Sequence, residues 1–164
     1  MSPLRRRVTA SVLAATAALT MGACGTNFSA QTNQQYQAAE GANSRGEVDV
    51  MNTVLVADED GAGVVSAGVV NQTDDPQTIT AVTITTGDGQ SLTVEAPKTP
   101  VEVPAGDIVT LGQTGGDALY VVPEGAEAGD YVTISLTFSD APATEVDAPT
   151  VARSETYAEV APAS

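Results

Sequence analysis

A strict alternation of apolar and polar residues over 130–139 constrains the fold of this chain more than any other feature. Two sets of side chains alternate along the segment, Val132, Ile134, Leu136 and Phe138 in one and Tyr131, Thr133, Ser135 and Thr137 in the other. A period of two places these sets on opposite faces of a β-strand, with the apolar face against a core. Because no segment of the chain has a convincing apolar period of 3.6 residues, the pattern predicts an all-β protein.

Shorter segments of the same β-branched, alternating character lie before and after this strand. The expected strands are Glu47–Val50, which Asn52–Ala57 extends, and then Gly63–Asn71, Gln77–Thr86, Gln90–Glu95, Thr99–Val103, Asp107–Leu111, Ala118–Val122 and Thr144–Val151. Gly87-Asp88-Gly89 is a strong signal for a tight hairpin turn. Turn signals about every 8 to 12 residues predict an antiparallel β-sandwich over 46–151. Its core is expected to hold Val, Ile, Leu and Ala, with Phe138 and Tyr120 as larger members.

The N-terminal segment Met1–Ala23 has the three parts of an export signal. Residues 5–7 are arginines, residues 8–21 are apolar and uncharged, and residues 22–23 are the small pair that a signal peptidase requires. The apolar run is shorter than the about 20 residues that a membrane-spanning helix needs. We therefore predict that residues 1–23 form a cleaved signal peptide, used either by general secretion or, through its arginines, by twin-arginine export.

Cys24 is the only cysteine of the chain and directly follows this segment. The stretch Leu19–Cys24 resembles the bacterial lipobox, although Met21 stands where Leu is commonest. The resemblance implies a diacylglycerol thioether on Cys24 and cleavage between Ala23 and Cys24. Because two acyl chains anchor a protein stably, we predict a lipoprotein on the extracytoplasmic face of the cell membrane, with the bilayer as a partner. A plain secretory signal followed by an incidental thiol is the alternative.

Two flanking stretches lack the alternating pattern of the predicted sandwich. Residues 24–45 are rich in Gln, Asn, Ser, Ala and Gly, and they are expected to form a flexible tether. Residues 152–164 consist mainly of Ala, Pro, Glu and Ser, and they are expected to form a disordered acidic tail. Neither stretch has enough apolar residues in a regular period to offset the entropy lost on ordering.

The net charge excludes one class of partner. The chain has 6 Lys and Arg against 21 Asp and Glu. Removal of the three signal-peptide arginines leaves three basic residues and a net charge of −18. A chain with this charge repels nucleic acid, so we predict no nucleic-acid partner. The same charge favours basic partners and a loose accumulation of cations.

A family resemblance covers roughly residues 76–151. Val103-Pro104-Ala105-Gly106, a strand that ends at Leu111, a glycine-rich turn and the long strand after Ala128-Gly129-Asp130 look like the periplasmic copper chaperone family PCu(A)C. Actinobacterial lipoproteins of the LpqE type resemble the same pattern. The resemblance implies a cupredoxin-like or immunoglobulin-like antiparallel β-sandwich.

The copper ligands of that family have no counterpart in this chain. The resemblance implies Cu(I) ligation by His and Met, which are ligands that suit a soft metal. The chain has no His, and its three methionines are Met1, Met21 and Met51, of which the first two belong to the predicted signal peptide. Residues 87–95 and 107–113, which would carry the ligands, contain neither type. We predict no metal site of this kind, and we interpret Met51 as core or strand-edge filler.

Catalytic and calcium-binding motifs find little support. Asp58-Glu59-Asp60-Gly61 begins like a calcium loop, but the later ligands of that motif are missing, so we interpret it as a charged hairpin turn. A chain without His offers no such base to activate Ser or Thr as a nucleophile. We therefore predict no enzymatic activity and no cofactor.

These observations predict a binding or interaction module with an unknown envelope protein as partner. The alternative is a metal-handling envelope protein, either copper-chaperone-like or carboxylate-based. A structural envelope component is a third hypothesis.

Overall fold

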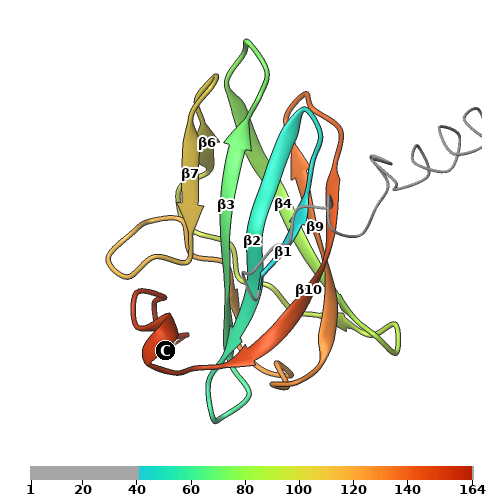
Figure 1. Cartoon of the computed structure of the whole chain (residues 1–164), viewed down its shortest axis with the longest axis vertical. Coiled ribbons are helices and arrows are strands. Elements are labelled where there is room, and N and C mark those ends of the chain that lie inside the picture. The colour runs from blue at the N-terminus through green and yellow to red at the C-terminus, as the bar shows by residue number, and fades with distance from the viewer. Residues whose placement is uncertain (1–40, 164) are drawn as a thin grey trace, which may run out of the picture. The chain divides into compact units, whose positions relative to one another are not determined.

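The computed structural model describes residues 41–163, which belong to one compact unit. Nearly all regular structure in these residues is β-strand (Figure 1). The strands are β1 (Ala42–Ser44), β2 (Val48–Ala57), β3 (Gly63–Asn71), β4 (Gln77–Thr86), β5 (Ser91–Leu92), β6 (Val101–Val103), β7 (Ile108–Leu111), β8 (Val121–Val122), β9 (Tyr131–Phe138) and β10 (Thr144–Ala152), followed by the 3-10 helix η2 (Glu155–Tyr157).

The strands form one sheet that folds into two layers. The order along its main path is β5-β4-β9-β10-β2-β3-β7, and β1, β6 and β8 pair with β2, β4 and β3. Residues 144–149 of β10 pair antiparallel with β9, whereas residues 150–152 pair in parallel with β2. One strand therefore passes from the first layer to the second. This confirms the prediction of an all-β sandwich.

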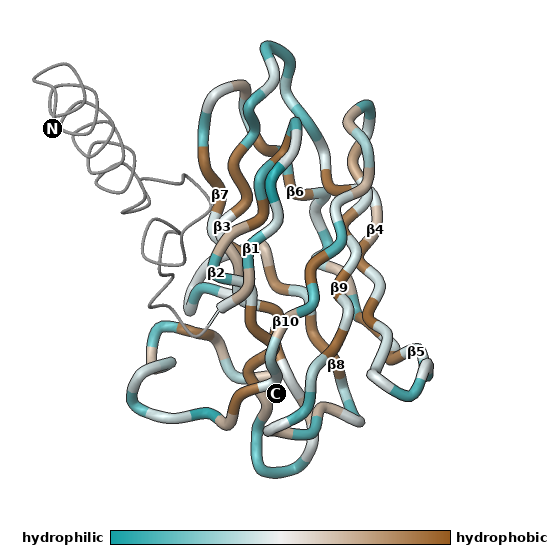
Figure 2. The backbone as a smooth tube through the Cα atoms, turned by 45° about the vertical axis from the view of Figure 1, so that its right-hand side comes forward, coloured by the Kyte–Doolittle hydropathy of each residue, from teal (hydrophilic) through white to brown (hydrophobic). Residues whose placement is uncertain are grey.

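The core lies between the two layers. In β9 the four apolar side chains are buried, while the alternating Tyr, Thr and Ser side chains are at least partly exposed, as the alternation predicts. Phe138 and Tyr120 are both buried in this core, in agreement with the expectation that they are its larger members. Figure 2 shows the same alternation as brown and teal segments along the strands.

A bulge interrupts β2, which corresponds to the predicted strand Glu47–Val50 with its extension Asn52–Ala57. The register of β2 against β3 shifts between Met51 and Val54, and Asn52 has a φ of 52°. The side-chain oxygen of Asn43 accepts a hydrogen bond from the Asn52 backbone N–H at 2.8 Å. An extra residue inverts the alternation of a strand. Val48 and Val50 therefore face the core before the bulge, and Leu55 and Ala57 face it afterwards.

Several predicted strands are shorter in the structure. The segment expected over 90–95 is reduced to β5, and that expected over 118–122 is reduced to β8. Pro97 and Pro100 lie between β5 and β6, both of which pair with β4, and they lack the N–H that would continue this pairing. Glu95 instead forms an isolated bridge with Val121.

The domain is longer at both ends than predicted. The tether is expected to extend to residue 45, but residues 42–44 form β1, which pairs with β2. The folded domain therefore begins earlier than predicted. The prediction of a disordered tail is wrong for residues 152–163. Ala152 ends β10, and Val160 and Ala161 are buried with exposures of 8% and 5%. The reason is that Val54, Val56 and Val64 form an apolar patch on the outer face of the sheet, against which Val160 packs.

The predicted signal peptide, Cys24 and residues 24–40 of the predicted tether lie outside the described residues. Within 41–163, no helix has the length and apolar character that crossing a bilayer requires.

Candidate functional site

Three loops and the end of β10 meet at one end of the sandwich. The β2–β3 hairpin, the β4–β5 hairpin and the loop between β8 and β9 lie at the lower end of Figure 1. The Ala126 N–H donates a hydrogen bond to the Gly61 carbonyl at 2.8 Å, and the Gly129 N–H donates one to the Thr150 carbonyl at 2.8 Å. These bonds fix the β8–β9 loop against its neighbours, and two hollows open beside it.

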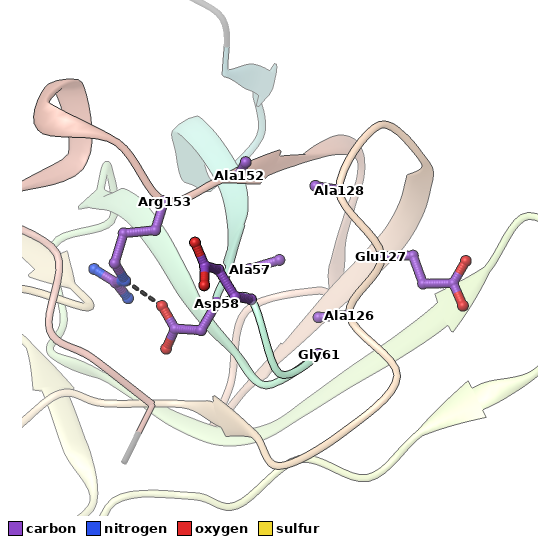
Figure 3. Close-up of a pocket in the computed structure, with 9 residues that line it drawn as sticks. Ala57, Asp58, Gly61, Ala126, Glu127, Ala128, Ala152 and Arg153 are labelled. Carbon is purple, nitrogen blue, oxygen red and sulfur yellow. Dashed lines mark hydrogen bonds and ion pairs between the residues drawn. The ribbon is translucent and has the colours of Figure 1, made fainter.

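The first hollow is lined mainly by small side chains and contains one ion pair at its rim. Its volume is about 440 Å³. Its lining comprises Ala57, Asp58, Glu59, Gly61, Ala126, Glu127, Ala128, Ala152 and Arg153. Figure 3 shows Asp58 and Arg153 joined at one side, while the carboxylate of Glu127 points away from that pair. The alanine side chains leave space but offer no hydrogen bonds to a ligand.

The Asp58–Arg153 pair ties the C-terminal residues to the β2–β3 hairpin. Arg153 Nε donates to Asp58 Oδ1, and its two Nη atoms donate to the carbonyls of Val160 and Ala161, each at 2.8 Å. The Ala163 N–H donates to Asp58 Oδ2 at 3.1 Å. Every nitrogen of the guanidinium is thus used within the chain, so this arginine serves a structural purpose at the rim of the hollow.

The ionisation of Asp58 reflects these contacts. Burial alone would raise the pKa of Asp58, but the hydrogen bonds from Arg153 and Ala163 and the guanidinium charge outweigh it, so the pKa is lowered from its ordinary value. Asp58 is therefore ionised at neutral pH. It acts as an acceptor in a fixed contact, and no catalytic acid is implied.

The sequence motif Asp58–Gly61 is a hairpin turn, as predicted. The Asp58 N–H donates to the Ala62 carbonyl at 2.7 Å, and the Gly61 N–H donates to the Asp58 carbonyl at 3.1 Å. The Asp60 carboxylate accepts from the Ala62 N–H at 3.2 Å. Within 41–163, no three His, Cys, Asp or Glu side chains are grouped so that they could hold a metal ion.

The second hollow lies between the β4–β5 hairpin and the β8–β9 loop. Its volume is about 570 Å³, and its lining residues are Thr86, Gly87, Asp88, Gln90, Leu92, Gly125, Glu127, Asp130 and Tyr131. Glu127 also lines the first hollow, so the two hollows adjoin. Three carboxylates and an aromatic ring border this space, and no basic side chain does.

Asp88 is held in place at the tip of the predicted hairpin turn. The Thr86 hydroxyl donates to Asp88 Oδ1, and the Gln90 side-chain amide donates to Asp88 Oδ2 at 2.9 Å. The first and then the second of these hydrogen bonds lower the pKa of Asp88. Gly89 has a φ of 87°, a conformation that glycine adopts at little cost, which explains its place in this turn.

Two residues that the sequence predicts as packing residues, Met51 and Tyr120, lie within the sandwich. Met51 lies half-buried beside the bulge of β2, an interior strand of the sheet, and pairs with Gly68 of β3. Tyr120 is 2% exposed, and burial raises the pKa of its phenol to about 12. It is therefore a protonated core residue at neutral pH.

Comparisons with known proteins identify the fold. No family model matches the sequence, and no curated protein matches it. Among solved structures, the apo PCuAC domain from PmoF1 has a TM-score of 0.54 and 22% identity, covering 68% of this chain and 99% of that domain. The copper-bound PCuAC domain from PmoF2 has a TM-score of 0.53 and 18% identity, covering 68% and 98%. Its apo form has a TM-score of 0.52 and 18% identity, covering 68% and 94%.

These likenesses establish a PCuAC-like, cupredoxin-like fold for this chain. They confirm, at the level of fold, the resemblance drawn from residues 76–151. The two hollows were not predicted. Their walls come largely from the turns that the sequence predicted at Asp58–Gly61 and Gly87–Gly89 and from the segment Ala128–Asp130. The sequence did not indicate that these separate segments meet at one end of the sandwich.

Proposed function

We propose that this protein is a membrane-anchored, extracytoplasmic lipoprotein that acts as a non-catalytic interaction module. The observation that supports it most is the combination of a PCuAC-like fold with a nearly empty set of soft metal ligands. The described domain contains one methionine, the half-buried Met51, and the whole chain contains no His. A fold of the copper-chaperone type is retained, while the side chains that suit Cu(I) are missing.

The loop end of the sandwich supports binding over catalysis. The acidic groups there are carboxylates apart from Tyr131, and two of them, Asp58 and Asp88, have lowered pKa values. General acid–base catalysis near neutral pH needs a group whose pKa lies close to that pH. Carboxylates held in the ionised state present fixed negative charge, which suits recognition of a partner.

The test of the anchoring is Cys24→Ser. A diacylglyceryl thioether needs the sulfur atom, so the variant is expected to leave the membrane fraction or to keep its signal peptide. The matched control is Ser29→Ala, which changes a nearby residue and should leave fractionation unchanged. A processed Cys24→Ser chain that still partitions with membranes would contradict the proposal.

The interaction role is tested by crosslinking in intact cells followed by mass spectrometry. The expected result is one or a few reproducible envelope proteins attached to the loop end. A titration that gave micromolar or tighter affinity for Cu(I) would instead favour the metal-handling alternative. A rise of several degrees in Tm at sub-millimolar Ca²⁺ would favour its carboxylate-based form.

A further inference from the structure

Tyr131 is the exposed aromatic residue of the described domain. Its side chain is 65% exposed, and Ile108 is the other large hydrophobic residue exposed within 41–163. Tyr131 begins β9 on the solvent-facing side of that strand, in register with Pro149 of β10. An exposed tyrosine ring at the mouth of a hollow is a typical anchor for a partner, because it offers large contact area at low entropic cost.

The two loops that form the hollow beside this ring are held in place by hydrogen bonds and close packing. The β4–β5 hairpin is closed by hydrogen bonds between Thr86 and Gln90 and is braced by the Asp88 contacts. On the other side, Gly125 has a φ of 88°, and a Cβ atom there would lie 3.1 Å from Leu92 Cδ2. The β8–β9 loop therefore lies directly against Leu92, and the hollow is shaped before any partner arrives.

The charge around the ring has one sign. Asp88, Glu127 and Asp130 border the hollow, and none of its nine lining residues is basic. Arg153 in the adjoining hollow is engaged by Asp58 and by the carbonyls of Val160 and Ala161. The guanidinium of Arg153 is therefore not free to neutralise the three carboxylates near Tyr131.

We propose that this hollow, bordered by Tyr131, Asp88, Glu127 and Asp130, binds a Lys or Arg side chain of a basic segment in a partner protein. A cation over a tyrosine ring gains a cation–π attraction, and carboxylates at the rim supply charge-assisted hydrogen bonds. The net charge of −15, or −18 without the predicted signal peptide, steers such a segment toward the domain. The inference rests on the proposed interaction role and names its site and partner chemistry.

The experiment titrates the full chain with tetralysine and, in parallel, with a neutral tetra-alanine peptide and a neutral tetrasaccharide. Calorimetry and NMR of the tyrosine ring follow binding at low and moderate salt. Tetralysine is expected to bind and shift the Tyr131 ring signals, with affinity falling as salt rises. The neutral peptide is expected not to bind. Tetrasaccharide binding at Tyr131 without tetralysine binding would overturn the proposal in favour of a carbohydrate ligand.

Variants separate this hollow from general attraction to an acidic protein. Tyr131→Ala is expected to weaken tetralysine binding by about 2- to 5-fold, the range for an exposed cation–π contact. Asp130→Asn should weaken it as well, whereas Glu145→Gln, the same loss of charge on an exposed residue of β10, should have little effect. Equal weakening by the last two variants would show non-specific attraction and overturn the proposal.

The outcome is distinguishable from failure of the interaction role itself. Cellular crosslinks that persist in Tyr131→Ala and map to another face would refute this site and leave the interaction module standing. Specific tetralysine binding with no crosslinked envelope protein would do the reverse.

Discussion

The two outer faces of the sandwich are built differently, although both belong to one sheet. On the β2–β3 layer, Val54, Val56 and Val64 face outward and are covered by Val160. On the β4–β9 layer, Thr133, Ser135 and Thr137 alternate outward from the core and no segment within 41–163 packs over them as an apolar cluster.

This difference shows which strands need a further segment of the chain to cover an apolar outer face. A strand with one polar face is complete once its apolar face meets a core. β2 is apolar on both faces after its bulge, with Leu55 and Ala57 in the main core and Val54 and Val56 outside it. Such a strand needs a second cover, and the segment after β10 provides it.

The largest effect is expected from removing that cover. A chain that ends at Ala152 lacks η2, Val160 and the Arg153 contacts, and exposes the outward valines of β2 and β3. We expect the free energy of unfolding to fall on the order of 3–6 kcal/mol, since burying one Val contributes about 1.5–3 kcal/mol. Urea unfolding followed by far-UV circular dichroism measures it. An unchanged midpoint would show that the cover is dispensable.

An intermediate effect is expected from Asp58→Asn, which weakens the attachment of the cover to the β2–β3 hairpin. At neutral pH the variant should lose about 1–3 kcal/mol, the range for charge-assisted hydrogen bonds. Because the pKa of Asp58 is lowered in the folded state, its contribution is present above the ordinary Asp pKa and is lost as pH falls through the folded value.

The difference between wild type and Asp58→Asn should therefore shrink as the pH of the unfolding experiment is lowered below about 4. Asp147→Asn, on the uncovered outer face of the β4–β9 layer, is the matched control. Its carboxylate accepts one hydrogen bond, from the exposed Thr133 hydroxyl at 2.8 Å. A constant difference between pH 7 and pH 3 would contradict the role of the ion pair.

The smallest effects are expected from an exchange of similar side chains between the two faces. Thr137→Val on the outer face of the β4–β9 layer, where the side chain is exposed, should change stability by less than about 0.5 kcal/mol, as surface substitutions do. Val54→Thr on the covered face buries a hydroxyl and should cost about 1–3 kcal/mol. Thermal unfolding of both variants compares them, and equal losses would remove the distinction between the faces.

Much of the fold could be predicted because alternation is a local signal. The buried and exposed positions of β9 follow directly from its sequence, and so does the turn at Gly87–Gly89. The bulge at Asn52 could not be read in the same way, since it depends on the partner strand and on the Asn43 side chain. The shortening of β5 and β8 likewise depends on where their partners end.

The cover and the hollows could not be predicted because they join distant segments. Asp58 and Arg153 lie 95 residues apart, and neither has a neighbour in sequence that points to the other. Residues 153–163 have a composition typical of disorder, yet Val160 finds an apolar surface that β2 and β3 create. The doubly apolar run Val54–Ala57 was the available clue that a cover was needed.

The sharing of β10 between the two layers has a consequence for the order of assembly. The end of β2 pairs with the end of β10, in the register Leu55↔Thr150, Val56↔Val151 and Ala57↔Ala152. The pairing of a strand near the start of the domain is therefore complete only after the last strand has formed. Contacts of such long sequence separation form late and slow folding. As the chain emerges from its N-terminus, β2 can pair with β1 and β3 at once, but residues 55–57 on its other edge stay unpaired until β10 arrives. During that interval the domain exposes an unpaired apolar strand edge to its surroundings, and β10 closes this edge when it pairs with β2.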